Sequence, residues 1–359
     1  MNDFFIKFSN FNTKIFVGQK ICAQIGQIVK QKLLFESLCN VVIITDNVVY
    51  NLFGKLVKQS FLNAGFKVLM FKIGSGEKSK NLNNFKKVCN FLIDHRIKRT
   101  DFIVSLGGGV VCDFAGFVSA CFLRGVRFIQ IPTTLLAMVD ACVGGKTALN
   151  LKQGKNLIGF FKQPDLVLCN LSFVETLPAV LISSAMAEII KYSVLFSESF
   201  FNFLLDCKLK LLIGELEKIV VKCLTFKKKL IEIDEFDEKN ERIKLNFGHT
   251  IGHALETYFG YDNTKLNHGQ AVALGMSFCT RQGEKLGLTK VGSFERLKLV
   301  LEKFNLPTSF KFNLKKLYAI CLNDKKIFSN GLNLVLIKEI GCCFVKKFSL
   351  AEFKNFLEI

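Results

Sequence analysis

The sequence lacks the cysteine patterns that mark a disulfide framework or a cysteine-bound zinc site. Its 13 cysteines are odd in number, none belongs to a C-x-x-C pair, and Cys342 and Cys343 are merely adjacent. It has no apolar run of the roughly 18 residues needed to span a bilayer, and its start, MNDFFIKFSN, lacks the regions of a signal peptide. These absences predict a soluble protein of the reducing cytoplasm with no membrane partner.

The basic charge also lacks the distribution that is typical of nucleic-acid binding. The formal net charge is +19 and the pI is near 9.4, but the lysines are spread over the whole chain. There is no dense basic tail and no interleaving of aromatic and basic residues. We therefore expect no nucleic-acid partner, and we interpret the charge as solvated surface with a local excess around an acidic small molecule.

The order of apolar segments predicts two domains, as the length of 359 residues does. Strand-like runs at 41–44 and 68–73 end in polar or glycine-containing turns, which indicates a parallel sheet with ligand-facing loops. Helices are expected at 181–196, 200–212, 216–233, 250–258 and 271–286. We thus expect a Rossmann-like α/β domain at 1–178 and a mostly α-helical domain at 179–359.

Two strand-to-loop junctions lie in residues 101–159, and the first is rich in glycine. An apolar run at 102–106 leads into Gly107, Gly108 and Gly109, and helical spacing follows up to Phe122. Glycines at a helix start let a pyrophosphate approach backbone amides, and the helix N-terminus favours anions. The pattern is neither G-x-G-x-x-G nor a P-loop, so a simple tight turn is an equal alternative.

The second junction follows an apolar run at 128–131 and is rich in polar side chains. The cluster contains Thr133, Thr134, Asp140, Gly144, Gly145, Lys146, Lys155 and Asn156. Apolar neighbours place the Asp140 carboxylate at the edge of a dry region, where it needs a partner or a task. Asp140 is therefore a candidate site residue; the alternative is a helix cap or a structural pair with Lys146.

Three of the four histidines lie in the second half and suggest a metal site. His249 and His253 are one helical turn apart, and His268 follows His249 by 268 − 249 = 19 residues. Glu188 stands in an otherwise apolar helix, and a carboxylate with two or three histidines suits catalytic zinc. The alternatives are solvated or capping histidines and a Glu188–Lys191 pair. The absence of H-E-x-x-H argues against a metalloprotease.

Together these motifs resemble those of the 3-dehydroquinate synthase family, over nearly the whole chain. The matching segments are SGEKSK, LGGGVVCDFAGF, RGVRFIQIPTTLLAMVDACVGGKTALN, GKNLIGFF, AEIIKY, LNFGHTIGHALE, LNHGQAVALGM and NDKK. The resemblance implies a homodimer that joins an NAD-binding domain to a metal-binding domain. It also implies a lyase of the shikimate pathway of aromatic amino acid biosynthesis. That enzyme converts an acidic sugar phosphate, 3-deoxy-D-arabino-heptulosonate 7-phosphate, to 3-dehydroquinate and phosphate. The implied steps are transient oxidation by NAD, elimination, reduction and aldol closure.

The resemblance also assigns site residues by position. NAD would contact Asp46, Ser75, Gly76, Glu77, Lys78, Ser79, Lys80, Gly109, Val110, Val111, Cys112, Asp113, Thr133, Thr134, Lys146, Lys155, Phe173, Val174, Glu175 and Thr176, with Asp140 near the nicotinamide. The metal, Zn²⁺ or Co²⁺, would be held by Glu188, His249 and His268. The substrate phosphate would meet Lys146, Asn156, His253, Lys325 and Arg124 of the partner subunit. Its carboxylate and hydroxyls would meet Lys191, Lys227, Arg242 and Asn246.

The sequence departs from the family pattern at three places. Cys112 replaces a glycine, and a thiol there must turn away from a bound cofactor. Gln270 replaces a glutamate that would support a metal ligand. The segment EIDEFDEKNERIKLN is one residue longer than usual. Two pairs of neighbours therefore compete for family positions: Asp237 with Glu238, and Lys227 with Lys228.

Three rival functions fit parts of the pattern. A related sugar phosphate cyclase could make an inosose or valiolone skeleton, but Arg242 and Asn246 favour an acidic substrate. A polyol dehydrogenase would release NADH, whereas Arg124, Lys146 and Lys325 favour a phosphate-bearing substrate. A non-catalytic basic binding protein gives no reason for the glutamate and two histidines.

Overall fold

The chain forms two compact units. The computed structural model describes residues 2–8, 11–33, 39–207, 214–262, 264–311, 313–322, 327–328 and 331–358. The first unit is Met1–Leu177 with Ile213–Phe236, and the second is Pro178–Leu212 with Asp237–Ile359. The helix at 216–233 thus belongs to the first unit, although a single boundary at 178 places it with the second. Helical spacing alone does not reveal which distant surface a helix packs against.

The first unit is built on a seven-stranded sheet of order β1-β2-β9-β6-β5-β3-β4, in which only the β1–β2 pair is antiparallel. The strands are β1 (Asn2–Lys7), β2 (Asn12–Gly18), β3 (Asn40–Asp46), β4 (Lys67–Ile73), β5 (Phe102–Gly107), β6 (Arg127–Pro132) and β9 (Leu166–Asn170). Because helices cover both faces of the parallel strands, β5 is buried along its whole length. The parallel sheet expected from the apolar runs is confirmed.

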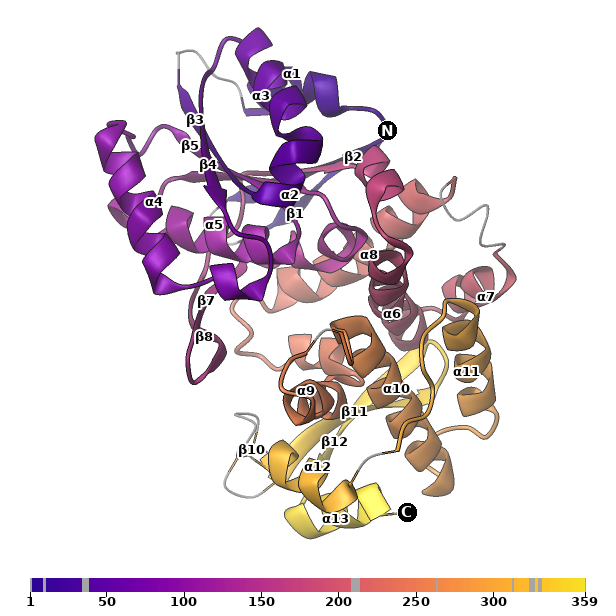
Figure 1. Cartoon of the computed structure of the whole chain (residues 1–359). Helices are drawn as coiled ribbons and strands as arrows, with labels where there is room; N and C mark the ends of the chain where they lie inside the picture. The colour runs from indigo at the N-terminus through magenta and orange to yellow at the C-terminus, as the bar shows by residue number, and fades with distance from the viewer. Residues whose placement is uncertain are drawn as a thin grey trace. The chain divides into compact units, whose positions relative to one another are not determined.

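Helices pack on both faces of this sheet (Figure 1). They are α1 (Ile25–Leu33), α2 (Asn47–Val49), α3 (Lys55–Asn63), α4 (Leu82–Asp94), α5 (Gly109–Cys121) and α8 (Leu216–Ile233). Apolar side chains of β3 and β5 meet those of α4 and α5 in one core that includes Val42, Ile103 and Phe114. A hairpin of β7 (Lys146–Leu151) and β8 (Gly154–Phe161) packs beside α5, and α8 packs on β1 and β2.

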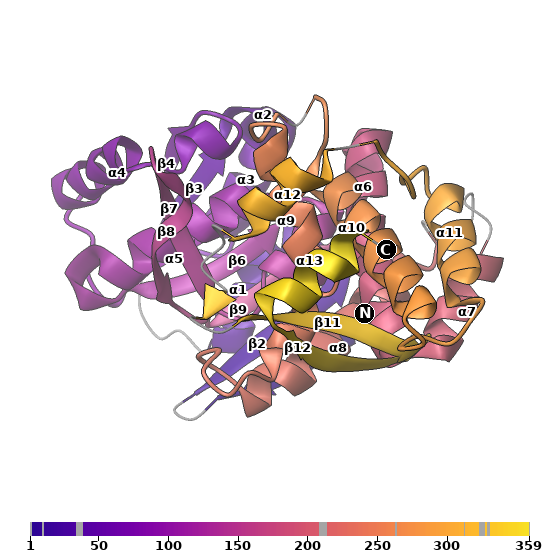
Figure 2. The same ribbon diagram turned by 90° about the horizontal axis from the view of Figure 1, so that it is seen from below.

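The second unit is mostly helical, as expected. Its helices are α6 (Ala179–Phe196), α7 (Glu198–Asp206), α9 (His249–Tyr258), α10 (His268–Lys285), α11 (Ser293–Lys303), α12 (Leu314–Leu322) and α13 (Leu350–Glu358). A small antiparallel sheet of β10 (Ile327–Phe328), β11 (Gly331–Glu339) and β12 (Cys342–Phe348) was not expected from the sequence. Figure 2 shows α13 beside the β11–β12 hairpin.

Helix α6 is long and apolar enough to cross a membrane by length and composition, but 67% of it is buried within the protein. It also carries Glu188 and Lys191, which are 1% and 2% exposed. Both the burial and the charged pair are properties of a core helix, since a charge inside a bilayer is costly.

Glycines let the helices α6, α9 and α10 meet backbone to backbone. Gly248, the residue before α9, has a left-handed φ of 75°. A Cβ atom on Gly275 would lie 1.9 Å from the Gly248 carbonyl oxygen, and one on Gly269 would lie 2.2 Å from the Ser184 carbonyl oxygen. No larger residue fits at either contact. These contacts therefore fix where α9 and α10 begin relative to α6.

Replacement of Gly275 by alanine should destabilise the protein. The added methyl group would overlap the Gly248 carbonyl, so we expect the free energy of unfolding to fall by about 1–3 kcal/mol. The matched control is Gly154→Ala, because the nearest atom to that Cβ would be 3.5 Å away. Urea unfolding of both variants checks this; equal stability of Gly275→Ala and the parent chain would contradict the packing argument.

Candidate active site

The glycine loop and the start of α5 form the first part of the candidate site. Gly108 is the N-cap of α5 and provides no side-chain cap. Just after β6, the backbone N–H of Thr133 donates to the carbonyl oxygen of Gly107 at 2.9 Å. The Thr133 hydroxyl is buried and has no hydrogen-bond partner among the described residues. A phosphate-bearing group at this edge would supply an acceptor for that hydroxyl and for the helix amides.

The Cys112 thiol does not occupy the space around the loop. Its sulfur lies 3.7 Å from the Gly107 carbonyl oxygen and 3.9 Å from the Ser105 hydroxyl, and Cys112 is 1% exposed. The side chain therefore lies in the core beneath the glycines, where burial raises the pKa of the thiol. The cysteine that replaces the family's glycine fits without covering the amides.

A buried lysine organises the polar residues beside the loop. Lys80, 1% exposed, donates to Asp113 at 2.7 Å and to the side-chain oxygen of Asn156 at 2.6 Å. Asn150 accepts from the Asn156 backbone N–H and donates to the Glu77 carboxylate at 2.6 Å. The predicted site residues in this network thus meet through Asn150, which the sequence reasoning missed. An asparagine in an apolar strand gave only a weak signal.

Asp46 and Ser75 lie together at the ends of β3 and β4. The Asp46 carboxylate accepts from the backbone N–H groups of Val48 and Val49, which caps α2. It also accepts from the Ser75 hydroxyl at 3.1 Å. Since both strands end at the carboxyl edge of the sheet, these residues lie where the parallel topology predicts a ligand.

Asp140 has a buried cationic partner. The Lys227 ammonium donates to the Asp140 backbone carbonyl and to its carboxylate, both at 2.7 Å. Lys227 is 6% exposed, whereas the side chain of Lys228 lies 3.8 Å from Glu232. This geometry favours Lys227 over Lys228 for the family position. The Lys227–Asp140 pair is one of the contacts that join α8 to the first unit.

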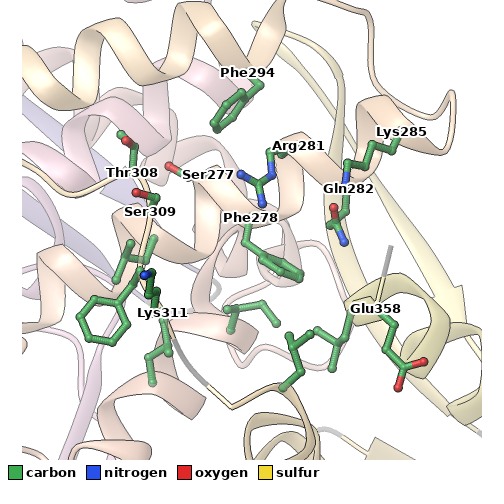
Figure 3. A pocket seen from close by; sticks show the side chains of 16 residues that line it. Ser277, Phe278, Arg281, Gln282, Lys285, Phe294, Thr308, Ser309, Lys311 and Glu358 are labelled. Carbon is green, nitrogen blue, oxygen red and sulfur yellow. The ribbon is translucent and has the colours of Figure 1, made fainter.

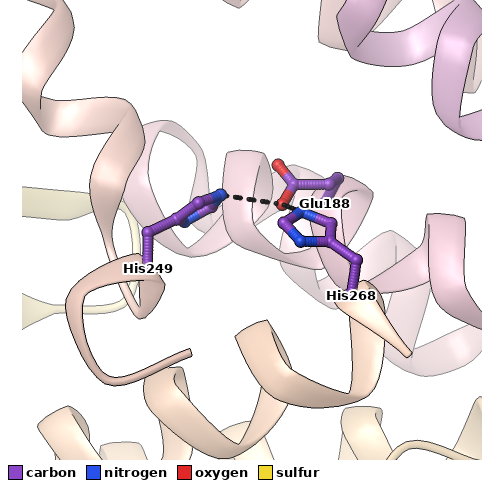
Figure 4. Close-up of side chains that lie close together, drawn as sticks. All are labelled: Glu188, His249 and His268. Atoms are coloured by element: carbon purple, nitrogen blue, oxygen red, sulfur yellow. Dashed lines mark ion pairs between the residues drawn. The ribbon is translucent and has the colours of Figure 1, made fainter. Parts of the chain in front are cut away.

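The metal-ligand candidates converge in the second unit. Glu188 lies on α6, and His249 and His268 are the first residues of α9 and α10; Figure 4 shows the three side chains pointing toward one another. Glu188 Oε1 is 3.3 Å from His249 Nε2 and 3.6 Å from His268 Nε2. Lys191 forms an ion pair with Glu188 Oε2. The structure therefore brings the three candidate ligands together and also contains the alternative, a Glu188–Lys191 pair.

Further contacts orient the two imidazoles. His249 Nδ1 lies 3.1 Å from the Phe247 carbonyl oxygen, and His268 Nδ1 lies 3.5 Å from Glu256 Oε2. Each contact favours a proton on Nδ1 and leaves Nε2 facing Glu188. Glu256 was missed from the sequence, although it lies seven residues after His249 and so shares its helix face.

The ionisable groups of the cluster shift one another's pKa values. Burial opposes ionisation of Glu188, but Lys191 and His249 outweigh it and hold the pKa of the carboxyl well below its usual range. Burial and the Lys191 charge lower the pKa of His249. Partial burial also opposes protonation of His268, but its contacts with Glu188 and Glu256 raise its pKa to about 10. Glu188 is thus an ionised carboxylate, and His268 must lose a proton before it can bind a metal ion.

His253 remains close to this cluster. Its ring centroid is 5.3 Å from that of His249 and 6.2 Å from that of His268. A second group of converging ligand atoms consists of His253, Glu256 and His268. The geometry brings all three histidines together and leaves both two- and three-histidine sets open.

Gln270 closes the N-terminus of α10. Its side chain accepts from the Asn267 backbone N–H, while the Asn267 side chain accepts from the Gln270 backbone N–H, both at 3.0 Å. This capping box accepts either Glu or Gln at the third position. The departure from the family's glutamate therefore preserves the local structure that places His268.

The other predicted residues lie in varied environments. The exposed residues are Lys78, Arg124, Lys146, Glu175 and Thr176, and exposed loops contain Gly76, Asp237 and Glu238. The partly buried residues are Gly109, Val110, Thr134, Lys155 and Asn246. The buried residues are Ser79, Val111, Phe173, Val174 and Arg242. Lys325 lies outside the described residues. The Phe173 ring packs against the Phe53 ring at a tilt, with centroids 4.3 Å apart, and Phe173 is buried in the core. Exposure does not decide between Asp237 and Glu238.

The fold is that of sugar phosphate cyclases. A crystal structure of 2-deoxy-scyllo-inosose synthase with carbaglucose-6-phosphate, NAD⁺ and Co²⁺ is similar with a TM-score of 0.87 and 21% identity over 99% of both chains. ValA, a 2-epi-5-epi-valiolone synthase from Streptomyces hygroscopicus with bound NAD⁺ and Zn²⁺, is similar with a TM-score of 0.86 and 20% sequence identity. The match covers 98% of this chain and 97% of ValA. A probable glycerol dehydrogenase from Sinorhizobium meliloti has a lower TM-score of 0.62 and 13% sequence identity, over 96% of this chain and 95% of the dehydrogenase.

Sequence comparison defines the family. Residues 70–184 match the 3-dehydroquinate synthase N-terminal model and residues 185–327 the C-terminal model. The chain is 40% identical to the 3-dehydroquinate synthase of Clostridium acetobutylicum over 96% of both chains. It is 41% identical to that of Streptococcus pneumoniae over 88% of this chain and 89% of the relative. The chain belongs to the 3-dehydroquinate synthase family, and the family and activity expected from the motifs are confirmed.

Replacement of Glu256 by glutamine should weaken metal binding without unfolding the protein. The change removes the charge that faces His268 Nδ1, and loss of such a contact typically lowers metal affinity by about 10–100-fold. Competition of the chain with a chelator for Zn²⁺ measures this. The control is Glu295→Gln, an exposed residue on α11; unchanged affinity in Glu256→Gln would contradict the orienting role.

Proposed function

We propose that the chain converts 3-deoxy-D-arabino-heptulosonate 7-phosphate to 3-dehydroquinate and phosphate, with NAD and a divalent metal, Zn²⁺ or Co²⁺, as cofactors. The observation that carries the proposal is the convergence of Glu188, His249 and His268 in a family that makes this product. Inosose and valiolone cyclases share the fold but only about 20% of the sequence. The identity of about 40% with 3-dehydroquinate synthases is therefore the stronger guide to the substrate.

The donor set in the second unit fits a metal. Both carboxylate oxygens of Glu188 are buried and have no hydrogen-bond partner of good geometry among the described residues, although charged groups lie beside them. Two imidazole nitrogens and one carboxylate oxygen form a donor set that zinc and cobalt accept. Glu188, His249 and His268 would hold the ion. His253 and Lys191 would then remain for the substrate.

The carboxyl edge of the first unit's sheet fits a dinucleotide. The uncapped amides of α5 and the unpartnered Thr133 hydroxyl suit a pyrophosphate. Lys80 fixes Asp113, and Asn150 fixes Glu77, so that the polar groups beside the loop are held before a ligand binds. The predicted NAD contacts at 46, 75–80, 109–113, 133–134 and 173–176 would serve this ligand.

When bound, the metal supplies Lewis-acid polarisation and NAD supplies an oxidation that is later reversed. The chain's own residues orient the reacting groups. Lys227 holds both the carbonyl and the carboxylate of Asp140, so that the carboxylate keeps one orientation. Lys191 neutralises Glu188 in the apolar interior of α6. The Arg242 charge and the Asn246 amide would recognise the substrate's carboxylate and hydroxyls.

Phosphate recognition would combine residues of two subunits. Leu123, Arg124 and Gly125 have positive φ angles of 51°, 60° and 117°, and Arg124 is exposed. The left-handed conformation is unfavourable for Leu123 and Arg124, whereas Gly125 adopts its positive φ readily. We propose a homodimer in which Arg124 reaches the phosphate of the neighbouring subunit, where Lys146, Asn156, His253 and Lys325 would also serve it.

The state of the cysteines bears on the cellular compartment. All 13 cysteines are free thiols, which fits a reducing cytoplasm. We propose that the protein acts there on small molecules, without a nucleic-acid or membrane partner.

Turnover with little NAD⁺ tests the function directly. Zinc-loaded protein, given the heptulosonate phosphate and substoichiometric NAD⁺, should release phosphate and 3-dehydroquinate over many turnovers with no lasting NADH absorbance. His268→Ala should lose metal and turnover and remain folded. Stoichiometric NADH without phosphate would indicate a dehydrogenase; no reaction with this substrate would favour a related cyclase.

Mixing two inactive variants tests the shared site. Arg124→Ala and His268→Ala, dissociated and reassociated together, should recover about a quarter of the parent activity, because half of the random dimers contain one intact site. Glu188→Ala mixed with His268→Ala is the control, since both changes affect the same metal site. Failure of the first mixture to exceed the control would overturn the proposed role of Arg124.

A further inference from the structure

The second unit contains a cavity that none of the metal ligands lines. Its volume is about 380 Å³, and it lies among α9, α10, α11, the segment 308–311, α12 and the end of α13. This volume is within the range of small-molecule sites, roughly 300–1,000 Å³. Figure 3 shows the side chains that surround it. The cavity shares α9 and α10 with the metal cluster but faces other residues of these helices.

One part of the cavity wall is apolar and aromatic. Leu274 is 4% exposed, and Phe278 and Phe294 are partly buried around the same space. Rings at this position provide flat apolar surface for an aromatic ring or a short hydrocarbon chain. The volume accommodates a single ring with a short side chain.

The charged side chains around the cavity are mainly basic. Arg281, Lys285 and Lys311 line it, against the single carboxylate of Glu358. The Arg281 guanidinium lies 5.9 Å from the centroid of the Phe294 ring. Arg281 forms no ion pair within the described part of the chain. Its planar donors are therefore available to an anion that reaches the apolar wall.

Two buried polar atoms at the cavity lack partners. Ser277 is 1% exposed, and its hydroxyl has no hydrogen bond among the described residues. Gln282 is 3% exposed; its side-chain nitrogen donates to the Phe356 carbonyl oxygen, but its side-chain oxygen has no partner there. Buried polar groups normally find partners, and such an exception requires an explanation. A ligand with a polar end would supply one for Ser277.

We propose that this cavity binds a small amphipathic carboxylate. Its ring would lie against Leu274, Phe278 and Phe294, and its carboxylate would meet Arg281 and accept a hydrogen bond from the Ser277 hydroxyl. The site is separate from the catalytic residues, and the proposal does not depend on the proposed function. The apolar wall, the unpaired guanidinium and the buried hydroxyl each account for one part of such a ligand.

Titration with 3-phenylpropionate tests the proposal. Calorimetry on the full chain should show saturable binding at one site. The neutral amide, 3-phenylpropanamide, should bind at least about tenfold more weakly than the carboxylate. Arg281→Gln should weaken carboxylate binding about tenfold, and Ser277→Ala severalfold. Arg281→Lys should restore part of the affinity because it keeps the charge but loses the planar donors. Lys298→Gln, on α11 and outside the cavity lining, should bind like the parent chain.

Three results would overturn the proposal. These are the absence of saturable binding up to millimolar 3-phenylpropionate, equal binding of the amide, and equal affinity in Arg281→Gln and the parent chain. The last result would place the bound carboxylate at another site. Arg281 is exposed, so its replacement should leave folding intact, and thermal unfolding of each variant verifies this.

Discussion

The proposed metal site depends on contacts in which helix backbones touch without side chains between them. Gly275 lies against Gly248, the residue before His249, and Gly269, the residue after His268, lies against Ser184 on α6. Ser184 is one helical turn before Glu188. The three proposed ligands therefore come from helix positions that steric exclusion fixes, and the approach of these helices does not depend on flexible side chains. Such preorganisation reduces the conformational entropy that the side chains lose when a metal ion binds.

The first unit uses a buried charge in the same way. Lys80 is almost fully buried and joins Asp113 to Asn156, and Asn150 extends the network to Glu77. A buried ammonium left without these partners would be very unfavourable. The network thus links the loop at 75–80 to the β7–β8 hairpin and holds both at the edge of the sheet.

Residue patterns predicted the regular elements well where the pattern was local. The four apolar runs of the first half are β3, β4, β5 and β6, and the helix expected at 216–233 is α8. Glu188, His249 and His268 were predicted as metal ligands from an isolated carboxylate and histidine spacing, together with the family resemblance, and the structure brings the three side chains together. The β11–β12 hairpin was missed because the second half was interpreted from helical spacing alone. Asn150 and Glu256 were missed because their roles depend on contacts that no local spacing specifies.

Two of the three departures from the family pattern illustrate the same limit. Whether Cys112 obstructs a cofactor depends on where its sulfur points, and the core beneath the glycines accommodates it. Whether Gln270 weakens a ligand depends on the capping box, which glutamine completes as well as glutamate does. Each question concerns a side-chain direction, which sequence does not specify.

Because α8 belongs to the first unit, that unit cannot be produced as one continuous fragment of the chain. The unit is discontinuous, since 213–236 joins it after the chain has passed through 178–212. A fragment that stops at 177 would lack the helix that covers β1 and β2, and Asp140 would lose Lys227. The boundary between the two family models, at 184/185, lies inside α6. A self-contained first unit would therefore have to be made by circular permutation or by splicing 213–236 onto residue 177.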